Sequence, residues 1–156
     1  ICSMKRFVLI MISVLAVSVT ALAQTPIEKL ITSYDDLHGV KVYDTKGGPL
    51  MALVRSNIRK SPMKPLADDV EEATILMMKK ASDQSKSKFL SSLRTALKSY
   101  QFYGRKPGVE GNLVEVYGSP VKDGAVAELI IFNPEIYSLF SLRGSYSVAE
   151  LKAMDK

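Results

Sequence analysis

Three stretches of the chain carry hydrophobic side chains at helical spacing. Residues three or four positions apart lie on the same side of a helix, so each stretch predicts a helix with one apolar face. The helix of the first stretch is predicted to begin at Thr25-Pro26-Ile27-Glu28. This sequence is a capping box, in which the Thr25 side chain accepts a backbone N–H and the Glu28 side chain reaches back to the start of the helix. Gly39 suits a left-handed turn after it. The stretches are 27–34, 50–58 and 89–100, and the third predicted helix ends by Gly104.

Alternating and β-branched segments predict strands at 40–43, 113–117, 126–132 and 137–142. Turn sequences containing proline, glycine or asparagine separate the last three, which predicts an antiparallel meander. The apolar run 73–78 fits either a buried strand or part of a helix, and we interpret it as a strand.

The order of these elements predicts the fold class. A final helix starts at Ser147-Val148-Ala149-Glu150, which has the pattern of a second capping box. The resulting order is α-β-α-β-α-β-β-β-α. It predicts an α+β fold with a mixed, mainly antiparallel sheet of about five strands and helices packed on one face. Residues 24–156 are expected to form a single domain.

The amino-terminal segment predicts export. Met4 precedes the basic pair Lys5-Arg6, the chain is then almost wholly apolar over 7–22, and it closes on Ala-Leu-Ala at 21–23. This pattern is typical of a cleavable secretory signal peptide. We therefore interpret residues 1–23 as upstream residues and signal peptide, with translation starting at Met4 and cleavage after residue 23. A retained membrane anchor is the alternative. A spanning helix needs about 20 apolar residues, however, and the apolar run 7–22 is shorter.

Loss of residues 1–23 changes the composition of the expected mature chain. The full chain has a formal charge of +5, whereas 19 basic and 16 acidic residues remain after cleavage, giving +3. Cys2, the one cysteine, is also removed, which excludes disulfide and thiolate chemistry. Gln24 would follow the cut, so we expect a periplasmic or secreted protein that is not a lipoprotein and has no stable membrane span. This mild charge and export argue against a nucleic-acid partner.

Candidate catalytic residues are few. His38 is the sole histidine, so a two-histidine metal site or a Ser-His-Asp triad is not expected. His38 with Asp35 and Asp36 could ligate a metal, but we favour the simpler interpretation of a polar helix end, where a cationic histidine is mildly favourable. The acidic run 68–72 lacks the glycine of a calcium loop and is interpreted as solvated. The sequence therefore predicts no catalytic residue, no metal and no cofactor.

Two groups of residues are candidate binding surfaces. Arg55 and Arg59 lie four apart on one helix face, where they could attract an anionic surface or an envelope protein. The alternative is a solvated helix end that suits the helix dipole. The second group has aromatic residues before a basic, glycine-bracketed segment, which could contact a partner or pack beneath a loop. Its residues are Phe102, Tyr103, Arg105 and Lys106.

The chain resembles a family of small exported proteins from Bacteroides and relatives, the domain of unknown function 4252 family. The resemblance spans the mature chain and lies in the signal peptide, the 27–31 helix and the strand after it, the 89–100 helix, and three later segments. These are 113–117, 128–130, and Arg143-Gly144 with the capped helix after it. Members are often encoded beside extracytoplasmic-function sigma factor and anti-sigma genes, which implies a role in envelope stress signalling. No active-site residue comes with the resemblance.

A non-catalytic binding or regulatory role in the bacterial cell envelope is the leading functional hypothesis, because no convergent set of catalytic residue types is present. One alternative is an envelope hydrolase with an unrecognised carboxylate or His38-centred site. The other is a structural or adhesive subunit that self-associates through an exposed strand or apolar patch.

Overall fold

The computed structural model describes residues 24–45, 48–108 and 111–154, so the predicted signal peptide lies outside the described residues. The helices are α2 (Pro26–Tyr34), α3 (Pro49–Arg59), α4 (Asp83–Ala96) and α5 (Val148–Ala153), with the 3-10 turns η1 (Lys64–Asp69) and η2 (Leu97–Ser99). The strands are β1 (Lys41–Thr45), β2 (Val70–Met77), β3 (Gln101–Pro107), β4 (Leu113–Gly118), β5 (Ala125–Asn133) and β6 (Ser138–Ser147).

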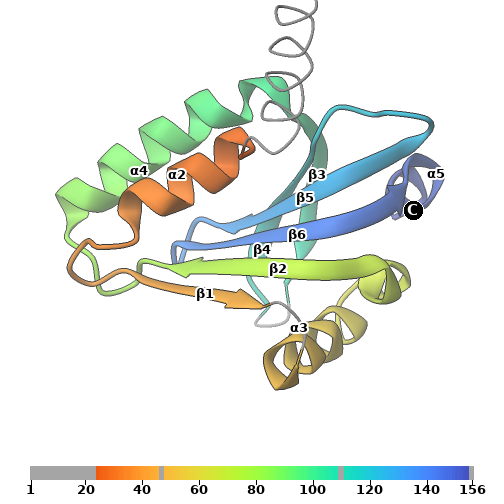
Figure 1. The fold of residues 1–156 in the computed structure, drawn as a ribbon, viewed down its shortest axis with the longest axis horizontal. Helices are drawn as coiled ribbons and strands as arrows, with labels where there is room; N and C mark the ends of the chain where they lie inside the picture. The colour runs from red at the N-terminus through yellow and green to blue at the C-terminus, as the bar shows by residue number, and fades with distance from the viewer. Residues whose placement is uncertain (1–23, 46–47, 109–110, 155–156) are drawn as a thin grey trace, which may run out of the picture.

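The six strands of the described residues form one sheet in the order β1-β2-β6-β5-β4-β3 (Figure 1). Every neighbouring pair is antiparallel, so the sheet is not mixed as predicted. The predicted α+β class is therefore confirmed, and so is the strand interpretation of 73–78, which lies largely within β2. Strands β3 to β6 are the predicted meander with one more strand. Strand β2 lies beside β6, which brings the first half of the chain against the last strand.

Strand β3 is the sixth strand, where the sequence predicted the end of a helix and a loop. Helix α4 ends at Ala96, and after η2 the backbone of Tyr100 is already extended. Gly104, at φ +102°, lies in a bulge of the β3–β4 pairing. The helical spacing of 89–100 extends the apolar pattern past the end of α4, which hid the strand.

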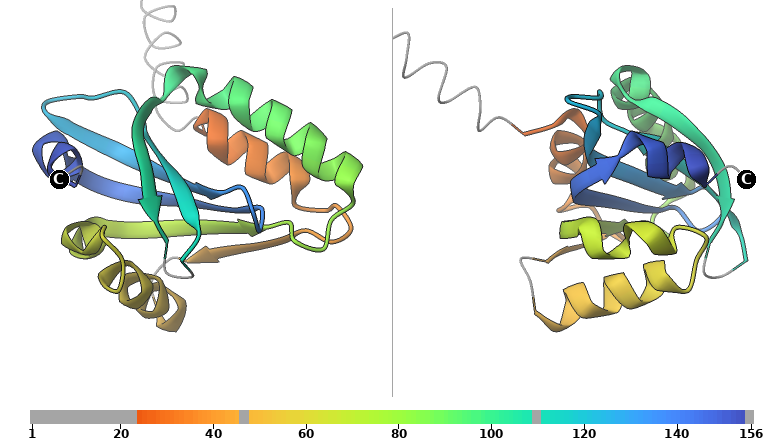
Figure 2. Two further views of the ribbon diagram at one scale, coloured as in Figure 1. Left: turned by 180° about the vertical axis from the view of Figure 1, so that it is seen from behind. Right: turned by 90° about the vertical axis from the view of Figure 1, so that its right-hand side faces the viewer.

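Helices cover both faces of the sheet, whereas the sequence predicted one (Figure 2). Helices α2 and α4 lie side by side over one core, and α3, η1 and α5 pack against the other. The reason is visible in β5, where Leu129 and Ile131 face one core while Ile130 and Phe132 face the other. A strand that is apolar on both sides needs cover on both sides.

The two predicted capping boxes have different outcomes. At α2 the box is present, because Glu28 N donates to Thr25 Oγ1 (3.2 Å) and Thr25 N donates to Glu28 Oε2 (3.3 Å). At α5 the helix begins where predicted, but the Ser147 side chain makes no capping hydrogen bond. The first N–H of that helix, at Val148, donates instead to the carbonyl of Gly124 (3.1 Å).

Candidate functional site

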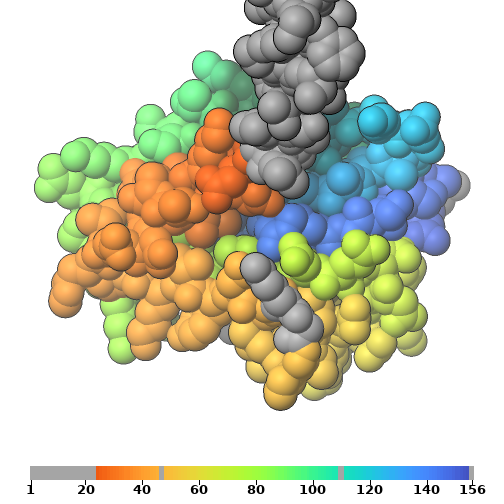
Figure 3. Space-filling view, in the orientation of Figure 1, coloured from red at the N-terminus to blue at the C-terminus, as the bar shows by residue number. Residues whose placement is uncertain are grey.

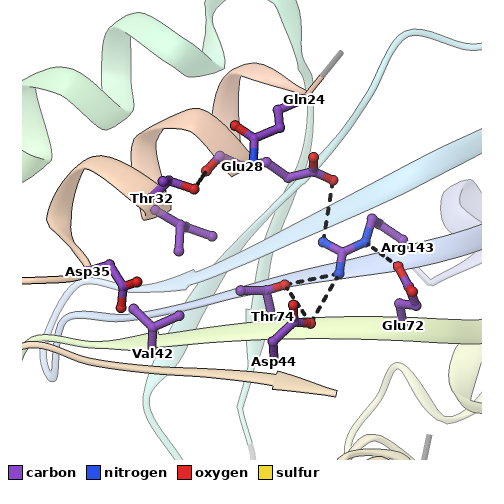
Figure 4. Close-up of a pocket in the computed structure, with 10 residues that line it drawn as sticks. Gln24, Glu28, Thr32, Asp35, Val42, Asp44, Glu72, Thr74 and Arg143 are labelled. Carbon is purple, nitrogen blue, oxygen red and sulfur yellow. Dashed lines mark hydrogen bonds and ion pairs between the residues drawn. The ribbon is translucent and has the colours of Figure 1, made fainter. Parts of the chain in front are cut away.

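A polar pocket of about 430 Å³ lies between α2 and the β1, β2 and β6 side of the sheet (Figure 4). The space-filling view shows α2 in orange at the surface of this face (Figure 3). Uncharged side chains from α2, β1 and β2 form part of its wall. The charged lining residues are Glu28, Asp35, Asp44, Glu72 and Arg143.

Arg143 is the one basic side chain among the lining residues, and three carboxylates surround it. Its Nε donates to Glu72 Oε2 (3.1 Å), and its Nη2 donates to Thr74 Oγ1 (3.0 Å). Two looser ion pairs complete the set, from Nη1 to Glu28 Oε1 (3.5 Å) and from Nη2 to Asp44 Oδ1 (3.7 Å). The side chain is 21% exposed, so a fixed guanidinium forms part of the pocket wall.

The pairing of β2 with β6 places these groups on the α2 face of the sheet. Glu72 is the register partner of Arg143, and a bulge between Val70 and Glu72 adjusts the pairing there. Beyond Arg143 comes Gly144, where a Cβ would lie 2.0 Å from the carbonyl oxygen of Asp69. Glycine at this position therefore allows the close backbone approach beside the pocket.

A buried carboxylate lies next to the pocket. Glu128 is 2% exposed and accepts hydrogen bonds from Thr25 Oγ1 (3.0 Å), Ser141 Oγ (2.8 Å) and the Tyr100 hydroxyl. Burial, and then the hydrogen bond to this carboxylate, raise the pKa of Tyr100. Ser141 Oγ also lies 3.5 Å from Arg143 Nη1 as its acceptor. This network joins the start of α2, the residue after η2 and the pocket.

The charges of the pocket favour a cationic ligand. Four carboxylates and one guanidinium line it, which gives a formal charge of −3, opposite in sign to the +5 of the whole chain. A cleft of one sign raises the local concentration of ions of the other. Among residues 24–45, 48–108 and 111–154 there is no group of three or more His, Cys, Asp or Glu placed to hold a metal ion.

The predicted aromatic and basic group is divided between the two faces of β3. Phe102 is 50% exposed, and its ring lies 5.1 Å from that of Tyr117. Arg105 is exposed and pairs in register with Glu115. Tyr103, 5% exposed, points into the core on the α3 side. The Lys106 side chain is also buried, with Nζ donating to the carbonyl of Met154 (3.3 Å).

The other predicted candidates lie away from the pocket. Arg55 Nη2 donates to the carbonyl of Val70 (2.6 Å), and Arg59 pairs with Asp68 (2.7 Å), so both side chains tie α3 to the segment around η1. The proposed anionic partner of these two residues stays a prediction. His38 is exposed after α2 and is not among the lining residues of the described pockets.

The sequence did not indicate the pocket, because its charged residues come from α2 and its C-cap, from β1, from β2 and from β6, and they have no local spacing. From the sequence, Glu72 belongs to an acidic run interpreted as solvated, and Arg143 belongs to the Arg143-Gly144 segment that follows the last predicted strand. The acidic–basic register pair of β2 and β6 becomes recognisable once the strand order is known.

An ion pair between α4 and β4 makes the free energy of unfolding depend on pH. Arg94 donates to both oxygens of Glu115 (2.6 and 3.1 Å), and this hydrogen bonding lowers the pKa of the Glu115 carboxyl. A lowered folded-state pKa adds stability at neutral pH that is lost as pH falls from about 4.3 through the folded value. Because the Arg94 side chain is about half exposed, we expect this pair to add about 1 kcal/mol to the free energy of unfolding.

Glu115→Gln should therefore be less stable than the unsubstituted protein at neutral pH and should lose less stability on acidification to about pH 3. Urea unfolding at both pH values measures this. Glu150→Gln, on the exposed side of α5, is the matched control. Equal acid dependence in the Glu115 variant and the unsubstituted protein would rule out this role for the pair.

Comparison with known proteins found no matching family model, no matching curated protein and no matching solved structure. The family resemblance therefore stays an expectation. Among the described helices, none is long and apolar enough to cross a membrane.

Proposed function

We propose that the protein is an exported, non-catalytic binding component of the bacterial cell envelope, and that it holds a small cationic group in the pocket at Arg143. The observation that supports this most is the pocket lining, in which four carboxylates outnumber one guanidinium. A part in envelope stress signalling belongs to the same proposal and rests on the family resemblance.

Size and charge define the ligand class. At about 30 Å³ for each water-sized unit, a volume of about 430 Å³ has room for roughly fourteen heavy atoms. Arg143 already engages Glu28, Asp44 and Glu72, and it closes the sheet side of the pocket. Asp35, on the exposed side of the lining, adds a further carboxylate for an ammonium or guanidinium group. Aliphatic amines are therefore the expected ligand class.

Cadaverine and its neutral diol analogue of equal chain length are the matched probes. We expect calorimetric titration to show at least about tenfold tighter binding of the diamine, because only the diamine complements the carboxylates. Added salt should weaken that binding by screening. Recovery of unchanged diamine after incubation is expected for a non-catalytic protein.

Asp35→Asn should weaken diamine binding about threefold, and the double change Asp35→Asn with Asp44→Asn about tenfold, since each exposed ion pair contributes modestly. Asp36→Asn is the matched control, because Asp36 is exposed next to Asp35 but is not among the pocket-lining residues. Equal affinity for the diol and the diamine would contradict the proposal. So would a loss of diamine affinity in Asp36→Asn as large as that in Asp35→Asn. Chemical conversion of the diamine would contradict its non-catalytic part.

A further inference from the structure

A second cavity of about 270 Å³ lies on the opposite face of the sheet, beneath the C-terminal half of α3. Apolar side chains from α3, from the segment that follows it and from the four strands β2, β4, β5 and β6 form its walls. None of the described residues that line it carries a charge. The principal wall residues are Val54, Ile58, Met63, Val114, Ile131 and Phe140.

Two polar side chains of the wall are engaged by the backbone beside them. Ser61 Oγ donates to the carbonyl of Ile58 (2.7 Å) and accepts from Met63 N (3.1 Å). Asn133 Oδ1 accepts from the backbone N–H groups of Glu135 (3.1 Å) and Ile136 (3.4 Å). These bonds satisfy polar atoms of Ser61 and Asn133, and the remaining wall is mainly hydrocarbon.

We propose that this cavity binds the aliphatic chain of a small uncharged amphiphile. At about 30 Å³ for each water-sized unit, it holds roughly nine heavy atoms, which is more than one aliphatic side chain of a partner protein would fill. Met77, 39% exposed, and the partly exposed Ile136 give the ligand an entrance. The partly exposed amide of Asn57 is a hydrogen-bond partner for a hydroxyl head group.

A series of straight-chain primary alcohols tests this proposal, with binding followed through the methionine methyl NMR signals of the full chain. Each methylene that enters the cavity should lower Kd about fourfold, and this gain should stop near a chain of roughly nine heavy atoms. The signals of Met63 and Met77 should shift in a saturable manner. Met78, in the core on the other face of the sheet, is the internal control.

Ile136→Trp should block the entrance and weaken octanol binding at least about tenfold, because the larger ring occupies the space of the chain. Val121→Trp is the matched control, since Val121 is exposed in the β4–β5 turn and is not among the lining residues. Equal shifts of Met78 and Met77, or affinity that keeps rising with longer alcohols, would overturn the proposal. The methionine shifts and the dependence of affinity on chain length are both measured on the unsubstituted protein, so they do not depend on folding of the variant.

Discussion

Glu128→Ala is expected to lower the free energy of unfolding by about 3 kcal/mol, because it removes the acceptor of three hydroxyl groups in a buried site. Thr25, Tyr100 and Ser141 would each lose a partner. Their positions at the start of α2, after η2 and in β6 mean that three segments lose a shared contact. Chemical denaturation at neutral pH measures the change.

The matched control is Glu135→Ala in the turn between β5 and β6, where the side chain is exposed. That change is expected to alter stability by less than about 0.5 kcal/mol. If the Glu128 variant loses no more stability than the control, the buried carboxylate does not hold these segments together.

Gly39→Ala is expected to cost about 3 kcal/mol or more, because two separate penalties add. Gly39 has φ +82°, a conformation that side chains with a Cβ rarely adopt. A Cβ there would also lie 2.4 Å from the carbonyl oxygen of Lys80 and 2.8 Å from the Cα of Ala81. The clash would push the α2–β1 turn away from the β2–α4 connection, and with it the helix that lines the polar pocket.

Gly124→Ala separates the two penalties. Gly124 has a similar φ of +75°, but nothing lies within 4 Å of the position that a Cβ would take. We expect this variant to lose only about 1 kcal/mol, the cost of the backbone conformation alone. Thermal or urea unfolding of both variants gives the comparison. Equal losses would show that the close approach to Lys80 contributes nothing.

Local patterns were enough to predict most of the fold. The capping box at Thr25, the amphipathic helices and the closely spaced strand signals depend on short spacings, and each appears in the structure. The prediction failed where two patterns compete. Tyr100 continues the helical spacing of α4, although Phe102 and Tyr103 already alternate between exposed and buried as residues of β3 do. Helices on both faces follow from long-range packing, which local periodicity does not contain.

The polar pocket required tertiary information. Glu28 and Asp44 become neighbours of Arg143 only when β2 pairs with β6 and α2 lies above them. Before that pairing is known, Glu28 is recognisable only as a helix-capping residue, and nothing in the sequence links Asp44 to Arg143. The aromatic and basic group near β3 was predicted from adjacency in sequence, but alternation along a strand sends Phe102 and Tyr103 to opposite faces.

NMR mapping of cadaverine on the isotope-labelled protein tests the cation-binding proposal most directly. The backbone amide signals of pocket residues such as Thr32, Asp35 and Thr74 are expected to shift in a saturable manner, while those around Phe102 stay unchanged. The neutral diol should not shift the pocket signals in a saturable manner. Equal shifts at Phe102 and at the pocket, or no saturable shift at the pocket residues, would contradict the account.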